Sequence, residues 1–252
     1  MPIEYILGRK EFCNRTFFVD KNVLIPREDT EVLVEAVIAR QVPTSARLVC
    51  GTRKSEKIDK LSVAQTVLDF AEYLSVPAGQ VGLRRVLDLC TGSGCVGVTL
   101  ALAGYAVVAS DVSAAALGVA RRNAEMHNVE VEFIQSDMFT NISEERKFDI
   151  IVSNPPYIKT DEIGLHDPGI LHEPRLALDG GADGLWFYGI IAREAGKYLV
   201  AGGMLALEIG YDQSAAVRDL LLAHGWGKIK FIKDRHGHER VIIATCPDQG
   251  RI

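Results

Sequence analysis

The segment directly after apolar residues 148–153 is suited to chemistry on a planar nitrogen, and reads Asn154-Pro155-Pro156-Tyr157. Proline fixes φ near about −65° and favours extended backbone before it, so the two prolines make this segment rigid. The Asn154 side-chain oxygen and the Pro155 carbonyl can accept the two hydrogens of such a nitrogen. Its lone pair is then aimed at an electrophile, which suits methylation of a carboxamide or an aromatic amine.

We therefore expect catalysis from Asn154, Pro155 and Tyr157, with all four residues, Pro156 included, touching the substrate. The Tyr157 ring can stack on the flat group that is methylated. A strong general base is not required, because the methylated nitrogen becomes acidic and can lose its proton to water. A rigid turn after a strand is the alternative interpretation of the same segment.

A second candidate site lies upstream, where Gly92-Ser93-Gly94 follows the apolar segment 85–90. Glycines at this point let the backbone turn tightly and let a ligand approach main-chain N–H groups. A Gly-x-Gly turn occurs in many α/β proteins, so the loop alone is weak support for a ligand site.

Two acidic residues strengthen that interpretation. Asp111 ends the next apolar segment, where a carboxylate can accept hydrogen bonds from both hydroxyls of a ribose. Asp137 ends a third segment, where it can accept from an adenine amino group while Met138 packs on the ring. Three strand ends that face one crevice predict a nucleoside-binding site.

The loop leaves two kinds of cofactor open. The dinucleotide-binding motif has a third glycine, and Gly97 can serve as that glycine. The tetrapeptide at 154–157 decides between them, because its chemistry requires a methyl donor, and S-adenosylmethionine carries its methyl group on a sulfonium.

The chain from residue 85 onward alternates between buried strands and helices. The expected strands are 85–90, 106–112, 131–137, 148–153 and 204–209. The expected helices are 96–103, 114–127 with Ser113 as its N-cap, 185–199 and 214–224. This alternation predicts parallel β-α-β units and a doubly wound, Rossmann-like α/β sheet. Trp186, Phe187 and Tyr188 are expected to pack their helix against that sheet.

The end of the chain departs from this alternation. Segments 228–233 and 240–246 are both strand-like, and their connection is too short for a crossover helix. They are expected to form an antiparallel hairpin at the sheet edge. A parallel sheet with such a terminal hairpin is typical of class I S-adenosylmethionine-dependent methyltransferases, with strand order 3-2-1-4-5-7-6.

The first part of the chain differs in kind. Segments 9–12 and 16–19 predict a small β-hairpin, and residues 28–39 and 63–74 have helical spacing. We expect residues 1–25 to form this N-terminal hairpin and a linker segment. The methyltransferase domain is expected over residues 26–252, with an insertion and a lead-in helix at 41–82.

Nearly the whole chain resembles the HemK/PrmC-type protein-(glutamine-N5) methyltransferases. Besides the loop and the tetrapeptide, the similarity rests on residues 172–178 (HEPRLAL), 183–185 (DGL), 2–8 (PIEYILG) and 23–31 (VLIPREDTE). The tetrapeptide alone is shared with adenine-N6 and some rRNA methyltransferases. The His-Glu-Pro and Ile-Pro-Arg segments are the features that favour glutamine.

This resemblance implies methylation of the glutamine side chain in the Gly-Gly-Gln motif of peptide chain release factors. S-adenosylmethionine is the implied methyl donor and S-adenosylhomocysteine the product. The cofactor-binding residues carried over by motif are Cys90, Thr91, Gly92, Ser93, Gly94, Asp111, Met138 and Asn154. Asp137 joins them on the strand-end reasoning above.

The chain departs from the family pattern in three places. Glycine is usual where this chain has Cys90, whose Cβ narrows the cofactor loop, and a negative φ is expected to accommodate this side chain. An aromatic residue is frequent in the place of Met138, so the adenine is expected to be held less tightly. The helical N-terminal domain that helps these enzymes recognise the release factor is expected to be absent before Pro2.

Composition excludes several classes of protein. An apolar content of 48% over 252 residues excludes disorder, and a net charge of −5 disfavours a broad nucleic-acid-binding face. The five cysteines lack the spacing of zinc ligands, so we expect no metal site. With neither a signal peptide nor an apolar run of membrane-spanning length, a cytoplasmic protein without membrane contact is expected.

Two other functions stay open at this point. A nucleic-acid amine methyltransferase, acting on adenine N6 or rRNA, shares the tetrapeptide and fits the local basic residues Arg53, Lys54, Lys57 and Lys60. A non-catalytic protein that binds S-adenosylmethionine fits the departure at Cys90 and the expected lack of the recognition domain.

Overall fold

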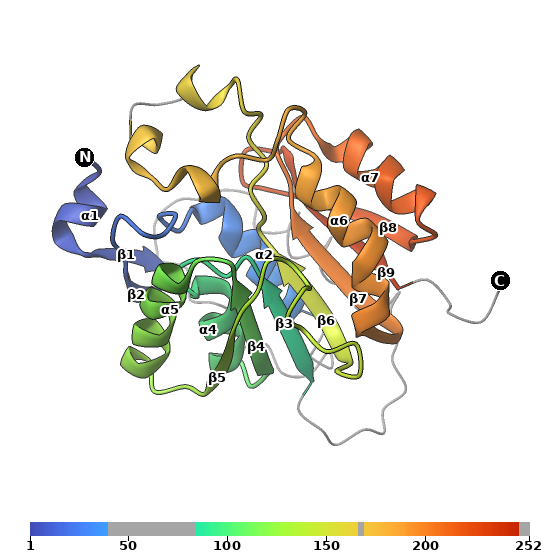
Figure 1. Ribbon diagram of the computed structural model, residues 1–252, viewed down its shortest axis with the longest axis horizontal. Helices are drawn as coiled ribbons and strands as arrows, with labels where there is room; N and C mark the ends of the chain where they lie inside the picture. Colours follow the sequence, from blue (N-terminus) through green and yellow to red (C-terminus); the bar gives the residue numbers. More distant parts are fainter. Residues whose placement is uncertain (40–83, 166–168, 247–252) are drawn as a thin grey trace.

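The computed structural model describes residues 1–39, 84–165 and 169–246 (Figure 1). Its centre is a seven-stranded sheet in the order β5-β4-β3-β6-β7-β9-β8. These strands are β3 (Arg85–Leu89), β4 (Ala106–Asp111), β5 (Val131–Gln135), β6 (Phe148–Ser153), β7 (Leu199–Glu208), β8 (Gly227–Lys233) and β9 (Glu239–Thr245). Strands β3 to β7 are parallel, whereas β9 runs antiparallel to both of its neighbours. The predicted strand order and terminal hairpin are therefore confirmed.

Helices cover both faces of the sheet (Figure 1). On one side pack α2 (Glu28–Ile38), α4 (Cys95–Leu102) and α5 (Ala114–Met126). On the other pack α6 (Trp186–Glu194), the short 3-10 helix η4 (Ala195–Tyr198) and α7 (Ser214–Ala223). Three more 3-10 turns, η1 (Ile163–Leu165), η2 (Ile170–His172) and η3 (Arg175–Ala177), lie between β6 and α6. A sheet covered on both faces needs apolar strands without alternation, as in β3 and β6.

The predicted helix start at residue 114 is confirmed in detail. Ser113 has extended backbone, and its side-chain oxygen accepts a hydrogen bond from the Ala116 N–H at 3.2 Å. That bond satisfies one of the amide groups that the first turn of a helix leaves unpaired. The helix therefore begins immediately after the carboxyl end of β4, beside Asp111.

The N-terminal hairpin consists of β1 (Arg9–Phe12) and β2 (Arg15–Phe18), as predicted to within one residue. The buried Asn123 of α5 accepts from the Phe18 N–H at 2.7 Å and donates to the Phe18 carbonyl at 2.9 Å. The same Nδ2 atom also donates to the Ser93 carbonyl at 2.8 Å. One side chain thus links the hairpin to the glycine loop.

Some element boundaries differ from prediction. Strand β7 begins at Leu199 rather than at residue 204, and the helix expected over 185–199 is split into α6 and η4. A short helix, α1 (Ile3–Leu7), was not predicted. The expected helix 63–74 and the 41–82 segment lie outside the described residues. Among the helices of the described ranges, none has both the length and the apolar character that crossing a membrane requires.

Candidate active site

A cavity of about 350 Å³ lies at the carboxyl ends of the central parallel strands. Nine of the predicted site residues line it, namely Cys90, Thr91, Gly92, Ser93, Asp111, Asp137, Met138, Asn154 and Pro156. Gly94, Pro155 and Tyr157 are outside this lining. The loops after four parallel strands therefore meet around one space, as the topology of an open α/β sheet requires.

The buried carboxylate of Asp88, which was not among the predicted site residues, holds the glycine loop in place. Asp88 of β3 is 1% exposed and accepts hydrogen bonds from the Thr91 hydroxyl and from the Gly97 N–H at 2.9 Å. Burial raises the pKa of Asp88 to about 7. A Cβ on Gly97 would lie 2.9 Å from Asp88 Oδ2, so this glycine allows α4 to approach the strand.

Both glycines of the turn have left-handed backbone, with φ +54° at Gly92 and +79° at Gly94. The Gly92 N–H donates to Asp111 Oδ2 at 2.9 Å, and the Ser113 N–H donates to Oδ1 at the same distance. A Cβ at Gly94 would lie 2.9 Å from Ala120 Cβ in α5. The turn thus orients the Asp111 carboxylate toward the cavity while α5 packs behind it.

Two residues that carry a side chain, Cys90 and Met138, also have left-handed backbone. Cys90 has φ +58° and Met138 has φ +48°, and their sulfur atoms lie 3.8 Å apart. The expectation that a negative φ accommodates Cys90 is wrong, because the turn that follows β3 requires the left-handed region at this position. Such outliers cluster where a site holds the backbone in place.

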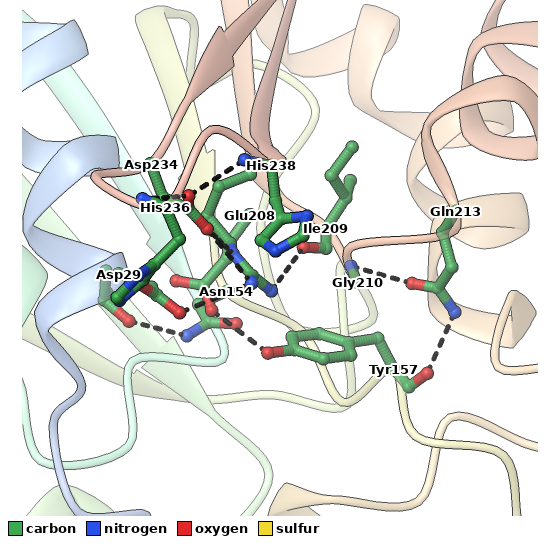
Figure 2. Close-up of polar contacts among 12 residues, drawn as sticks. Asp29, Asn154, Tyr157, Glu208, Ile209, Gly210, Gln213, Asp234, His236 and His238 are labelled. Carbon is green, nitrogen blue, oxygen red and sulfur yellow. Dashed lines mark hydrogen bonds and ion pairs between the residues drawn. The ribbon is translucent and has the colours of Figure 1, made fainter.

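The tetrapeptide is held by contacts from three elements (Figure 2). Asn154 Nδ2 donates to Thr30 Oγ1 of α2 at 3.1 Å, and the Tyr157 hydroxyl donates to Glu208 Oε1 at the end of β7 at 3.3 Å. The Tyr157 carbonyl accepts from Gln213 Nε2 at 3.0 Å. Burial and the nearby Glu208 carboxylate raise the pKa of Tyr157 far above the functional range, so the tyrosine stays neutral.

The two sequence segments that favoured glutamine methyltransferases meet in the structure. Glu173 is buried, accepts from the Ile25 N–H at 3.1 Å and forms an ion pair with Arg27. Its neighbour Pro174 lines the cavity, together with Pro26 from the other segment. These contacts fix one wall of the site.

Trp186 lies at the mouth of the cavity rather than in the helix-sheet interface, which corrects the expectation for this residue. Its side chain is 66% exposed and lines the cavity, whereas Tyr188 is buried. The helix begins at Trp186, so the first side chain projects from its end instead of toward the sheet.

Comparison with known proteins identifies the family. The chain is 36% identical over 246 residues to a release factor glutamine methyltransferase of Agrobacterium fabrum, covering 96% of this chain and 73% of that protein. A protein of the same name from Neisseria gonorrhoeae is 39% identical, with 96% and 76% covered. The chain belongs to the release factor glutamine methyltransferase family.

Two other comparisons also match methyltransferases. The family model described as "Methyltransferase small domain" matches residues 64–167. A protein named bifunctional methyltransferase from Rickettsia felis is 41% identical over 254 residues, which cover 97% of this chain. The chain spans only 45% of that relative's length.

Solved structures support the fold. A methyltransferase from Pyrococcus furiosus superposes with a TM-score of 0.52 at 22% identity, covering 71% of this chain and 83% of that chain. The hMettl16 catalytic domain in complex with MAT2A 3'UTR hairpin 1 gives 0.55 at 15% identity, with 98% and 89% covered. At these identities the similarity shows the class I methyltransferase fold alone.

The cofactor of this methyltransferase family is S-adenosylmethionine, and the cavity fits it. A volume of about 350 Å³ lies within the usual range for ligand pockets. Nothing lies within 4 Å of a Cβ built on Gly92, so the loop leaves open space at that point. The carboxylates of Asp111 and Asp137 line the same cavity, and they are acceptors suited to ribose hydroxyls and an adenine amino group.

The left-handed backbone at Cys90 predicts an inverted order of stability between two variants. We expect Cys90→Gly to be more stable than Cys90→Ala by about 1 kcal/mol, because only alanine has a Cβ that clashes in this conformation. At Arg121, an exposed position inside helix α5, the order is reversed, since glycine is less favourable than alanine in a helix interior by about 1 kcal/mol. Urea denaturation of the four variants measures both differences in the free energy of unfolding. The prediction is contradicted if glycine is the more stable variant at both sites, or alanine at both.

Proposed function

We propose that this chain methylates the side-chain amide nitrogen of a glutamine in a protein, with S-adenosylmethionine as donor. The substrate we propose is the Gly-Gly-Gln motif of a peptide chain release factor. The observation that carries the proposal is the position of Asn154, which lines the cavity with its amide group oriented by Thr30. The names of relatives at 36–39% identity support the same substrate.

When bound, S-adenosylmethionine supplies an electrophilic methyl group on a positively charged sulfur. The proposed cofactor contacts are the Cys90 to Gly94 loop, Asp111, Asp137, Met138 and Asn154. Each oxygen of the Asp111 carboxylate already accepts one backbone N–H, and each has a further lone pair for a ribose hydroxyl. The preformed loop thus offers acceptors without a rearrangement of the backbone.

The tetrapeptide is proposed to bind and orient the glutamine amide. Because Asn154 Nδ2 donates to Thr30, its Oδ1 is left to accept one amide hydrogen of the substrate. The Pro155 carbonyl accepts the other, and Pro156 and Tyr157 provide the contact surface. Two acceptors hold the planar nitrogen with its lone pair directed at the methyl group, which lowers the barrier through orientation. Water takes the proton that the nitrogen loses after transfer.

A direct assay tests this function. The purified chain is incubated with S-adenosylmethionine carrying an isotopically labelled methyl group and with a release factor that contains Gly-Gly-Gln. We expect one methyl group on the motif glutamine, located by mass spectrometry of the digested release factor. A release factor with asparagine in place of that glutamine is the matched control. Label that enters RNA or DNA instead of the release factor would overturn the proposal.

A further inference from the structure

A buried carboxylate without a role in the proposed chemistry lies directly behind the tetrapeptide. Glu208, the last residue of β7, is 1% exposed. Its Oε1 accepts from the Tyr157 hydroxyl at 3.3 Å, whereas its buried Oε2 has no hydrogen-bond partner among the described residues. Burying a carboxylate with one oxygen unpaired is costly, so its retention at this position needs a reason.

Thr30 connects this carboxylate to Asn154. The Thr30 side chain lies beside Glu208 and lowers the pKa of its carboxyl group, and Thr30 Oγ1 accepts a hydrogen bond from Asn154 Nδ2 at 3.1 Å. A hydroxyl has a single hydrogen, so a Thr30 hydroxyl that donates to Glu208 can only accept from Asn154. The asparagine must then present its NH₂ group to Thr30 and keep its oxygen for the substrate. In that arrangement the direction of hydrogen bonding at Asn154, which contacts the substrate amide, depends on Glu208.

The charged groups around Glu208 leave its own charge only partly compensated. Arg240 of β9 and Asp29 of α2 both face it, and Arg240 also pairs with Asp29 at 3.4 Å and with Asp234 at 3.2 Å (Figure 2). The guanidinium charge is thus shared among several carboxylates. Burial, together with the nearby charge of Asp29, raises the pKa of Glu208 to about 7. The carboxyl group therefore changes its charge close to neutral pH.

Three other titratable neighbours have their pKa values raised by burial. These are the Tyr157 hydroxyl, the Tyr188 hydroxyl, which donates to the Glu208 main-chain carbonyl at 2.8 Å, and the Cys95 thiol. His236 and His238 also belong to this cluster, since their main-chain N–H groups donate to the Asp234 carboxylate that pairs with Arg240. A change of charge at Glu208 is therefore assigned by a variant of Glu208 itself.

We propose that Glu208 is a positioning residue for amide methylation, whose ionised carboxylate orders the Thr30 and Tyr157 hydroxyls and thereby holds Asn154 in its acceptor orientation. The inference rests on the function proposed above. A hydrogen bond to an ionised acceptor is roughly twice as strong as one to a neutral acceptor. Protonation of Glu208 loosens both hydroxyls, and the Asn154 amide can then turn its NH₂ group toward the substrate. The rate of transfer at saturating substrate rises with pH as Glu208 ionises.

The pH profile of Glu208→Gln tests this role. For the wild-type chain we expect kcat to rise about three- to tenfold from about pH 6 to about pH 8. Glu208→Gln keeps the size of the side chain and one neutral acceptor oxygen. Its kcat should therefore stay, at every pH, near the wild-type value at low pH. The affinity for S-adenosylmethionine, measured by calorimetry, should change less than about twofold. Tyr188→Phe, which loses only the bond to the Glu208 main chain, is the matched control and should keep the wild-type profile.

The Thr30 link has its own test. Thr30→Val removes the hydroxyl but keeps the shape of the side chain, and we expect it to lower kcat about tenfold and to abolish the pH dependence. Thr30→Ser restores a hydroxyl and should recover both. A loss that serine does not rescue would indicate packing and would overturn the role of the hydroxyl.

Infrared difference spectroscopy adds a readout independent of activity. Lowering the pH from about 8 to about 6 should produce the C=O band of a protonated buried carboxyl group, which Glu208→Gln removes while the Asp88 signal remains. A wild-type chain that transfers no methyl group at any pH overturns the proposed function, and with it this role. An active wild type whose pH profile is shared by Glu208→Gln overturns the role of Glu208 alone.

Discussion

Asn154→Ala should lower the rate of methyl transfer to the release factor by about 100- to 1,000-fold. The substitution removes the side-chain oxygen that is proposed to accept one amide hydrogen. The substrate nitrogen then keeps only one of its two hydrogen-bond acceptors, and its lone pair is no longer directed at the methyl group. The cofactor should still bind, because the Asp111 carboxylate and the glycine loop are positioned by contacts that do not involve Asn154. Single-turnover kinetics and calorimetry with S-adenosylmethionine separate the two effects.

A second variant of Asn154 and a control variant test this prediction further. Asn154→Asp keeps an oxygen in the acceptor position but loses the NH₂ group that donates to Thr30, so its activity should lie between wild type and Asn154→Ala. Arg218→Ala, at an exposed position of α7, is the control and should leave the rate unchanged. An Asn154→Ala protein that keeps more than about a tenth of the wild-type rate would contradict the acceptor role.

Gly184→Ala should both destabilise the protein and impair catalysis. Gly184 has φ +73°, and a Cβ there would lie 2.5 Å from the Tyr157 carbonyl oxygen and 2.6 Å from Gln213 Nε2. Because the first of these is backbone, relief requires the tetrapeptide itself to move. We expect the free energy of unfolding to fall by about 3 kcal/mol, from the left-handed strain together with the steric clash. Urea denaturation measures this loss.

The expected effect of Gly184→Ala on activity follows from Gln213. This buried side chain accepts from the Gly210 N–H at 3.0 Å and donates to the Tyr157 carbonyl (Figure 2). It also donates to the Gly184 carbonyl at 3.3 Å. A methyl group at residue 184 intrudes between these partners, so the Tyr157 loop loses its anchor and the rate of transfer should fall at least about tenfold. The matched control is Gly189→Ala in α6, where nothing lies within 4 Å of the new Cβ. That variant should be as stable as the wild type or slightly more so, since alanine favours helix. Equal stability of the two variants would contradict the prediction.

Strand order and helix positions could be predicted because periodicity is a local property of the chain. Segment 148–153 is mostly apolar and lacks the alternation of a half-exposed strand, as a strand buried on both faces requires, and β6 has these bounds. The connection between β8 and β9 is too short for a crossover helix, so the antiparallel end of the sheet could be predicted from the length of this connection. The start of β7 was predicted five residues too late, because Leu199 is separated from Met204 by exposed residues whose pairing with β6 is irregular.

The candidate site was predicted in part. Glycines and acidic residues at strand ends are visible in sequence, and Asp111, Asp137 and Asn154 line one cavity in the structure. Asp88 and Glu208 left a weaker signal, each being a single carboxylate within an apolar strand segment. No sequence pattern pointed to Thr30, because its contact with Asn154 arises only from the packing of α2 against the tetrapeptide.

Local sequence patterns were enough to predict the alternation of strands and helices, the family resemblance and the residue types that could bind a nucleoside and a planar nitrogen. Which side chains act together depends on the fold. Thr30, Glu208 and the tetrapeptide with Asn154 and Tyr157 come from three separate segments, and they are joined by the Asn154–Thr30 and Tyr157–Glu208 hydrogen bonds. The fold also decides that Cys90 adopts a left-handed backbone, which its residue type disfavours. The physical reason is the same in both cases, since contacts between distant segments and the turn geometry they impose outweigh local preference.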